Sequence, residues 1–505
     1  MLARRRRNPH ERSGFSTGSE RQIWRALCAA NRLVSTAAEE ASNAIRCESF
    51  RQMDREGLQG KWFAESPFYC LWSLFLMKAI VLGAGVTGIT SAWFLKQEGF
   101  DVTVVDRQPA AGMETSFANG GQISVSHAEP WANPGAPKKV LKWLMKEDAP
   151  LLFRLRADAR QWRWGMQFLR ECTPEKTRHN IIQMVNLGTY SRSTLQELRA
   201  ETGIEYNCLT KGILHFYTNQ QEFDDALEPA EIMREFGCDR KVISAEEAVR
   251  LEPALATVKD KIAGATYTEA DESGDAHVFT QNLSKLCAAK GVEFKYDTAI
   301  LGLDTEGGQI SGVRVRGADG QVQVLKADKY LLCMGSYSPM LVKDLGVDLL
   351  IYPAKGYSAT LQIDDASKAP QVSLTDDEYK LVFSRLGDKL RIAGTAELNG
   401  YSTNLNHVRC QAITRRVMEL FPGMADPEQA VYWTGLRPAT PSNVPYIGVS
   451  KISNLYLNTG HGTLGWTHSC GSGRSIASIM NGKQPELDFA FTGISSKKGE
   501  ALAVA

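Results

Sequence analysis

Three glycines and one aspartate have the types and spacing that bind a dinucleotide. The segment Gly83-Ala84-Gly85-Val86-Thr87-Gly88 has the form G-x-G-x-x-G, and Asp106 follows about twenty residues later. Gly83 permits a tight turn, Gly85 lets the backbone approach a pyrophosphate, and Gly88 lets a helix pack closely on a strand. Asp106 can accept hydrogen bonds from ribose hydroxyls, which favours a cofactor without a 2′-phosphate. The motif leaves NAD and FAD open, because both are bound through it.

A second glycine-rich turn lies near the other end of the chain. The segment Gly460-His461-Gly462-Thr463-Leu464-Gly465 follows an apolar run and precedes a helix-like run that begins at Trp466. Its backbone amides can contact an anionic or electron-rich ring edge. We interpret His461 as a residue that shapes this turn rather than as a base. Two further glycine-bearing segments, at residues 114–122 and at Gly335, lie between the two turns.

The elements around these turns follow the order of a nucleotide-binding α/β domain. Strand-like runs at 79–82 and 102–105 flank a helix-like run at 89–97. Buried-type strands at 330–334 and 455–458 precede the later glycines, which is typical of a nucleotide domain split by an insertion. A compact NAD domain would not need that return near the C-terminus. Further strands are predicted at 212–218, 351–362 and 381–395, and helices at 221–235 and 409–420.

Composition excludes several classes of protein. The 505 residues contain 58 Lys+Arg and 57 Asp+Glu, so a net charge of +1 provides no global field to attract nucleic acid. The ten cysteines include no C-x-x-C pair, and the eight histidines lack the spacing of metal ligands. We therefore expect a globular enzyme of two or three domains in a reducing compartment, with no disulfide framework and no metal site.

Residues 1–76 differ in character from the rest of the chain. They begin with four consecutive arginines at 4–7, and they show no periodicity before an apolar patch at 68–76. A targeting segment is a poor fit, because the apolar part lies far from the N-terminus. A membrane span over 68–86 would include glycines of the first motif. We predict that Met77 is the natural start and that the upstream part is a disordered leader or a mis-assigned start.

Five segments, at residues 114–135, 279–283, 352–358, 433–438 and 458–467, carry a family resemblance. The last two read Trp-Thr-Gly-Leu-Arg-Pro and Asn-Thr-Gly-His-Gly-Thr-Leu-Gly-Trp-Thr. Together the segments resemble the small subunit of FAD-dependent D-amino acid dehydrogenases and, more distantly, D-amino acid, glycine and sarcosine oxidases. The pair Ser126-His127 departs from the family, where Gly-Tyr is usual, and this difference bears on the substrate range rather than on the cofactor.

The resemblance, which spans about residues 77–493, implies a fold and a reaction. The fold is α/β, a Rossmann-type FAD-binding domain interleaved with a substrate domain built on an antiparallel sheet. The reaction is oxidative deamination, in which the Cα hydrogen of a D-amino acid leaves as hydride to flavin N5 and water converts the imino acid to a 2-oxo acid and ammonia. The implied boundaries are 77–160, 276–345 and 433–493 for the FAD-binding domain, 161–275 and 346–432 mainly for the substrate domain, and 494–505 for a tail.

Candidate site residues follow from the motifs and the resemblance. Arg437 matches the carboxylate-binding arginine of the related oxidases, and its planar guanidinium suits a carboxylate. Lys355 and Tyr357 are weaker catalytic candidates, and Tyr379 and Lys380 weaker still. The expected FAD-binding residues are Val81, Leu82, Gly83, Ala84, Gly85, Val86, Thr87, Gly88, Asp106, Arg107, Ser116, Asn119, Gly120, Gly121, Gln122, Gly335, Gly460, Gly462, Thr463, Leu464 and Gly465.

The segment 131–164 is rich in tryptophan and basic residues, which predicts either contact with a membrane surface or a helical cover on the substrate domain. Membrane contact suits a quinone or respiratory-chain electron acceptor, which the resemblance implies. The expected location is cytoplasmic, and membrane contact would make the protein peripheral on the cytoplasmic face of the inner membrane. Three alternatives stay open: a glycine- or sarcosine-type oxidase that uses oxygen, an NAD-dependent dehydrogenase, and a non-catalytic nucleotide-binding protein.

Overall fold

The computed structural model describes residues 76–143, 147 and 149–494. The predicted leader, up to residue 75, and the tail beyond residue 494 lie outside the described residues.

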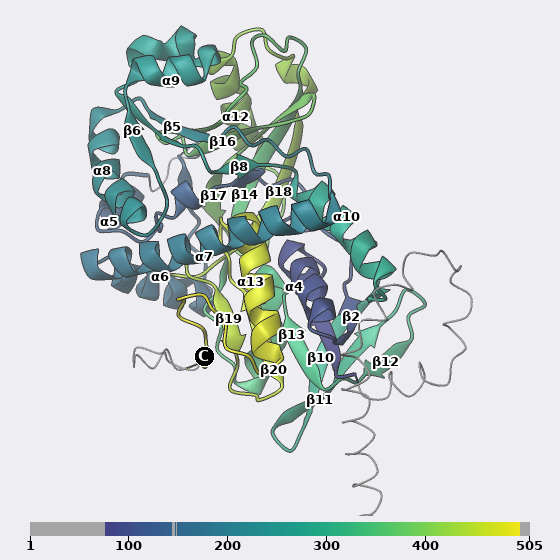
Figure 1. Ribbon diagram of the computed structural model, residues 1–505. Coiled ribbons are helices and arrows are strands. Elements are labelled where there is room, and N and C mark those ends of the chain that lie inside the picture. Colours follow the sequence, from purple (N-terminus) through teal and green to yellow (C-terminus); the bar gives the residue numbers. More distant parts are fainter. Residues whose placement is uncertain (1–75, 144–146, 148, 495–505) are drawn as a thin grey trace, which may run out of the picture. The chain divides into compact units, whose positions relative to one another are not determined.

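A six-stranded sheet in the order β19-β20-β13-β1-β2-β9 carries both glycine-rich turns (Figure 1). All neighbours pair in parallel except β19, which runs antiparallel to β20. A parallel sheet is covered on both faces, which explains why β20 is buried at every position. The strands are β1 (Lys78–Leu82), β2 (Asp101–Val105), β9 (Glu293–Lys295), β13 (Lys329–Leu332), β19 (Tyr446–Val449) and β20 (Leu455–Thr459).

Two helices, α4 (Val86–Gln97) and α13 (Gly465–Met480), contact the strands of this sheet, and α10 (Ala276–Ala289) and α7 (Pro174–Thr202) pack on α4 and on α13, respectively. α13 contacts both α4 and α7, so the C-terminal helix lies beside the helix of the first motif (Figure 1). α7 begins where the Thr173 side chain accepts a hydrogen bond from the Lys176 amide, and it ends at Gly203 with φ +64°. The chain therefore completes its first layer with its last helix, as the sequence predicted.

A nine-stranded sheet forms the second part. Its order is β18-β14-β17-β16-β15-β5-β7-β6, with β4 paired to β17. Most neighbours are antiparallel, whereas β15 with β5 and β17 with β4 are parallel. The strands are β4 (Leu151–Phe153), β5 (Ile213–Tyr217), β6 (Lys241–Ile243), β7 (Gly264–Thr268), β14 (Tyr352–Gln362), β15 (Ser373–Asp376), β16 (Leu381–Leu386), β17 (Lys389–Leu398) and β18 (Val431–Ala439). One face packs on α12 (His407–Leu420) in a core that includes Leu361, Ile413 and Val417.

The remaining elements are short. Two small sheets are formed by β10 (Ala299–Glu306), β11 (Gln309–Arg316) and β12 (Val322–Leu325), and by β3 (Gln122–Ile123) with β8 (Glu272–Ser273). The other α-helices described are α5 (Ala136–Trp143), α6 (Ala159–Glu171), α8 (Gln220–Glu235), α9 (Ala245–Leu251) and α11 (Ser338–Val342). Among the described residues, no helix combines the length and apolar character needed to cross a membrane.

The strands and helices predicted around the glycine motifs and in the large sheet are all present. The sequence segment 381–395 contains two strands of a hairpin, β16 and β17. The proposed domain boundaries assign β4 and most of β18 to the FAD-binding part, although both strands pair with the large sheet. The mixed α/β fold with an inserted, mainly antiparallel sheet is the one that the sequence predicted.

Candidate functional site

One cavity of about 720 Å³ gathers most of the predicted site residues. Its lining comes from the carboxyl ends of β1, β2, β13 and β20 and from the large sheet. Ligands of open α/β sheets bind at these strand ends. The predicted residues that line it are Gly83, Gly85, Val86, Thr87, Asp106, Arg107, Ser116, Asn119, Gly120, Gly121, Gln122, Gly335, Tyr357, Arg437, Gly460, Gly462, Thr463, Leu464 and Gly465. Val81, Leu82, Ala84, Gly88 and Lys355 do not line it.

The first glycine turn has the geometry of a pyrophosphate site. Gly83 has φ +110°, and a Cβ on Gly88 would lie 1.9 Å from the Gly83 carbonyl oxygen, so both glycines are needed to join the strand to the helix. A Cβ on Gly85 would meet nothing closer than the Ser116 hydroxyl at 3.7 Å, which leaves open space above the helix start. The amides of Gly85 and Thr87 donate to no described residue. They point the positive end of α4 toward an anion.

Asp106 lies at the carboxyl end of β2 with its carboxylate fixed by the backbone. Its Oδ2 accepts from the Ala84 amide at 2.6 Å and its Oδ1 from the Gln108 amide at 2.9 Å. Burial raises the pKa of Asp106, and the two amides oppose that rise. Beside it, Arg107 pairs with Glu114 at 2.7 Å and lies 4.2 Å over the Tyr337 ring. This end of the cavity can therefore hold a ribose and the base attached to it.

The C-terminal turn brings a second helix start to the same cavity. The amides of Thr463 and Gly465 have no acceptor among the described residues, and both residues line the cavity next to the start of α13. His461 is 3% exposed, and its Nε2 has no hydrogen-bond partner in the described part of the chain. Burial lowers the pKa of His461 to about 3, and the neighbouring His468 adds to this effect. His461 is therefore neutral, with one ring nitrogen available to a polar ligand.

Arg437 is a half-buried cation that faces the cavity and has no anionic partner among the described residues. It makes one hydrogen bond to the described chain, from Nη1 to the Thr395 carbonyl oxygen at 2.7 Å, and it forms no ion pair there. Burial lowers its pKa to about 10, and the nearby Arg409 guanidinium contributes. A Cβ on Gly356 would lie 2.4 Å from the guanidinium carbon, so this glycine makes room for the side chain. No residue that the structure describes supplies a carboxylate to this guanidinium, so an anionic ligand would be its natural partner.

Lys355 and Tyr357 occupy the opposite face of β14, which corrects their predicted catalytic roles. In the pairing with β18, Ala354 is opposite Arg437, so Ala354 and Gly356 share the face of Arg437. The Tyr357 hydroxyl donates to Glu397 at 2.5 Å, and the Lys355 ammonium lies 2.9 Å from the same carboxylate.

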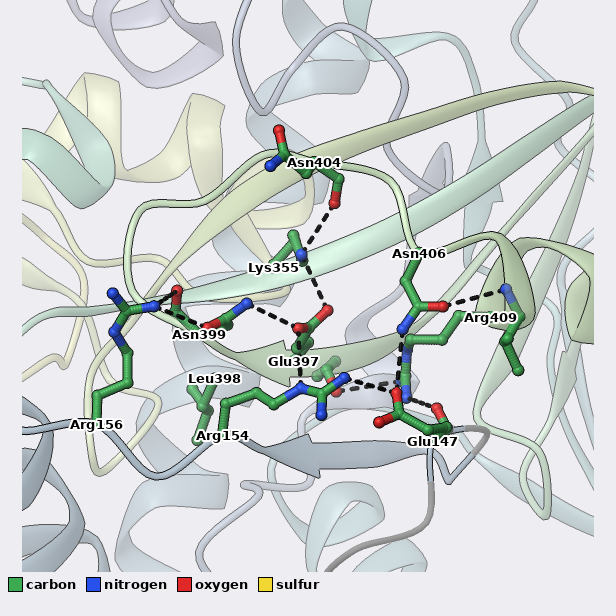
Figure 2. A network of polar contacts seen from close by, with 12 residues as sticks. Glu147, Arg154, Arg156, Lys355, Glu397, Leu398, Asn399, Asn404, Asn406 and Arg409 are labelled. Carbon is green, nitrogen blue, oxygen red and sulfur yellow. Dashed lines mark hydrogen bonds and ion pairs between the residues drawn. The ribbon is translucent and has the colours of Figure 1, made fainter.

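Figure 2 shows Lys355 and Glu397 within a network that also contains Arg154 and Arg409. Tyr357 reaches the cavity wall, but its polar atom is used behind the sheet. The network therefore supports the sheet that carries Arg437, and neither polar group is available to a ligand.

Two histidines that the sequence patterns did not single out as site residues form a polar wall of the cavity. His127 stacks on His215 with ring centroids 5.8 Å apart. The His215 ring contacts Ser126 Oγ at 3.2 Å and Asp377 Oδ2 at 2.9 Å. Lys380 lies 3.3 Å from the same aspartate. The parallel pairing of β5 with β15 brings these distant residues together, and no spacing in the sequence signals it.

Tyr379 does not line the cavity. It is 43% exposed, and the Arg416 guanidinium lies 4.1 Å from its ring centroid. Lys380 lines the cavity, so of these two weaker candidates only Lys380 can meet a ligand there.

Two helix starts at one cavity, with a carboxylate at one end and an unpaired guanidinium on the facing sheet, define a dinucleotide-binding enzyme with a separate anion site. The FAD dependent oxidoreductase family (DAO) matches residues 78–479, and the chain belongs to this family. It is 55% identical to the D-amino acid dehydrogenase of Dechloromonas aromatica (strain RCB) over 415 residues, which are 82% of this chain and 99% of that one. It is 50% identical to the D-amino acid dehydrogenase of Paramagnetospirillum magneticum (strain ATCC 700264 / AMB-1) over 419 residues, 83% and 98% of the two chains.

Solved structures show the same fold. Glycine oxidase from Bacillus cereus ATCC 14579 has a TM-score of 0.62 at 21% identity, covering 81% of this chain and 96% of that one. L-proline dehydrogenase from P. horikoshii has a TM-score of 0.63 at 16% identity, covering 82% and 95%. The comparisons confirm the predicted family, fold class and cofactor.

The residues present fit FAD, the cofactor of the family. The free space above Gly85 and the unpaired amides of α4 suit the pyrophosphate, and Asp106 suits the ribose. The free amides near the start of α13 and the unpartnered His461 Nε2 suit the polar edge of the ring system. NAD, which the first motif left open, is therefore set aside.

Proposed function

We propose that this protein oxidises D-amino acids to imino acids, which water converts to 2-oxo acids and ammonia. The observation that supports this most is Arg437, a half-buried guanidinium that faces the cofactor cavity and lacks an anionic partner in the described part of the chain. The carboxylate of an amino acid is the ligand that matches a planar guanidinium. The names of the relatives support the D configuration.

The chain contributes binding and orientation rather than strong acid–base groups. FAD bound in this cavity would supply the acceptor for the hydride of the substrate Cα, and the amine would lose a proton as the C=N bond forms. Arg437 fixes the carboxylate and thereby the position of Cα. Trp433 lines the cavity, as does the wall formed by His127 and His215. Together they limit the space for the side chain of the substrate. The histidine wall is polar where the family commonly has Gly-Tyr, so we expect it to influence substrate range.

Anaerobic reduction of the flavin tests the proposed function. The FAD-loaded protein, mixed without oxygen with D-alanine, D-proline or D-arginine, should lose its visible flavin absorbance and release a 2-oxo acid and ammonia in equal amounts. The L enantiomers serve as matched controls. Bleaching by none of the D-amino acids would contradict the proposal. Rapid bleaching by glycine, with peroxide formed on admitting oxygen, would favour the glycine- or sarcosine-type oxidase instead.

We further propose that the electrons pass to a quinone or another respiratory-chain acceptor at a membrane surface, which α6 contacts. Trp162, Met166 and Leu169 are 51%, 54% and 52% exposed, and their spacing places them on one face of α6. The opposite face packs inward, where Trp164 donates to the Ala439 carbonyl oxygen at 2.8 Å. Exposed basic residues of α5 and α6, Lys138, Lys142, Arg163 and Arg170, can attract anionic lipid headgroups.

The double substitution Trp162→Glu and Met166→Glu should release the protein from anionic vesicles. Burying each of these side chains in lipid contributes roughly 1.5–3 kcal/mol, so the double variant should lower the partition coefficient by about tenfold or more. Flotation with vesicles that contain an anionic phospholipid measures this. Val322→Glu on β12, where valine is 60% exposed, is the matched control. Equal flotation of the double variant and the wild type would contradict α6 as the contact.

A further inference from the structure

Thr395 occupies a β-bulge directly beside the guanidinium of Arg437. The pairing of β17 with β14 shifts between Gly394 and Glu397, so that two residues of β17 lie opposite Gly356 alone. The Thr395 carbonyl oxygen accepts the hydrogen bond from Arg437 Nη1 at 2.7 Å. The bulge therefore aims one backbone acceptor at the guanidinium and fixes its position.

The backbone of Thr395 is strained. Its φ is +51°, in the left-handed region that glycine adopts easily and that β-branched residues strongly disfavour. Strained residues of this kind persist mainly at functional sites, where the side chain or the backbone is used. Glycine at this position would relieve the strain and keep the carbonyl, so the strain points to a use for the side chain.

The Thr395 hydroxyl has no partner in the described part of the chain. Its Oγ1 is buried and makes no hydrogen bond there, although buried hydroxyls are nearly always bonded. Thr395 lines the cavity together with Arg437. A nearby threonine on β18 behaves differently, because the Thr434 hydroxyl donates to the Gly356 carbonyl oxygen at 2.8 Å.

We propose that the Thr395 hydroxyl donates a hydrogen bond to the substrate carboxylate, so that Thr395 and Arg437 form a two-residue clamp. A carboxylate has about four lone-pair sites, more than a single guanidinium satisfies in a buried place. The hydroxyl donor supplies a further bond and defines the orientation of the carboxylate about the guanidinium. The assignment rests on the proposed function, because it requires a carboxylate at Arg437.

Binding of two unreactive ligands to the FAD-loaded protein tests this clamp. 2-Methylalanine carries the amine and carboxylate but no Cα hydrogen, and propionate carries the carboxylate alone. Thr395→Val should weaken both by about tenfold or more, since a hydrogen bond to a charged group is lost, whereas Thr395→Ser should stay within about threefold of the wild type. Thr434→Val is the matched control and should leave both affinities unchanged. The change in the flavin spectrum on titration reports binding, and the affinity for FAD is measured in parallel.

Several results would overturn the clamp. The first is that Thr395→Val binds both ligands as tightly as the wild type. If the valine variant does not fold, Thr395→Ala is used in its place. Weaker binding of 2-methylalanine alone would also overturn it, because the hydroxyl would then bind the substrate amine. Weaker binding of FAD alone would assign the hydroxyl to the cofactor. Failure of the proposed function is distinguishable, because the wild type itself would then bind neither ligand and would not bleach with D-alanine.

Discussion

Arg437→Leu should abolish tight binding of amino acids and should not lower the stability of the substrate-free protein. The pKa of about 10 lies below the ordinary arginine value, so burial disfavours the charged form in the folded state. This penalty is present at every pH below about 10 and disappears as the pH rises toward the unfolded pKa. Leucine removes the penalty, which offsets the lost hydrogen bond to the Thr395 carbonyl oxygen.

With substrate bound, the sign reverses. The carboxylate then compensates the guanidinium, and removing one partner of a buried pair costs about 3–5 kcal/mol, equivalent to a rise in Kd of about a hundredfold to several-thousandfold. Spectral titration with 2-methylalanine measures the affinity, and thermal unfolding without ligand measures the stability. Arg437→Lys keeps the charge but not the planar fork, so its affinity should lie between those of the wild type and the leucine variant. An unchanged Kd in the leucine variant would refute the assignment.

The cofactor end of the site could be predicted from sequence because it acts through local backbone geometry. A tight turn at Gly83 and close packing at Gly88 are imposed within a few residues, and the contacts of a Cβ at these positions explain why only glycine fits. Asp106 can be predicted because it ends the next strand of the same strand–helix–strand unit, where its carboxylate accepts from the Ala84 amide. The C-terminal turn repeats this logic at Gly460, which has φ +84°.

The substrate end depends on strand register, which the sequence does not reveal. Lys355 and Tyr357 are close to Arg437 in space, but the pairing of Ala354 with Arg437 places them behind the sheet with Glu397. A shift by one residue would have turned their side chains toward the cavity. The bulge at Thr395 has no signal of its own, because a threonine in a strand normally favours extended backbone.

The histidine wall could not be predicted from the sequence, because it depends on the pairing of strands that are far apart in the chain. His215 and Asp377 are 162 residues apart in the chain, and their 2.9 Å contact exists because β5 and β15 are neighbours in the large sheet. The unusual Ser126-His127 pair was visible in the sequence as a departure from the family. What it does became visible only with its partner, since His127 is stacked on His215 and Ser126 contacts the same ring.

Valine at Gly85 should produce a folded but colourless protein. Gly85 has φ −70° and ψ 175°, which any residue adopts, and its nearest neighbour for a new Cβ is the Ser116 hydroxyl at 3.7 Å. The fold therefore tolerates a side chain, while the space above the two free amides of α4 is filled. Because the pyrophosphate can then no longer approach the backbone, the affinity for FAD should fall by about a hundredfold or more, roughly 3 kcal/mol.

Gly88 provides the matched control, since it belongs to the same motif but faces the strand. A Cβ at Gly88 would lie 1.9 Å from the Gly83 carbonyl oxygen, so even Gly88→Ala should disrupt the joining of β1 to α4 and lower the melting temperature of the apoprotein. The Gly85→Val apoprotein should have the same melting temperature as the wild-type apoprotein. It should not recover the flavin spectrum when FAD is added. A yellow Gly85→Val protein with wild-type FAD affinity would place the pyrophosphate elsewhere. Loss of folding in both variants would instead mean that Gly85, like Gly88, is required by the packing of the turn rather than by the cofactor.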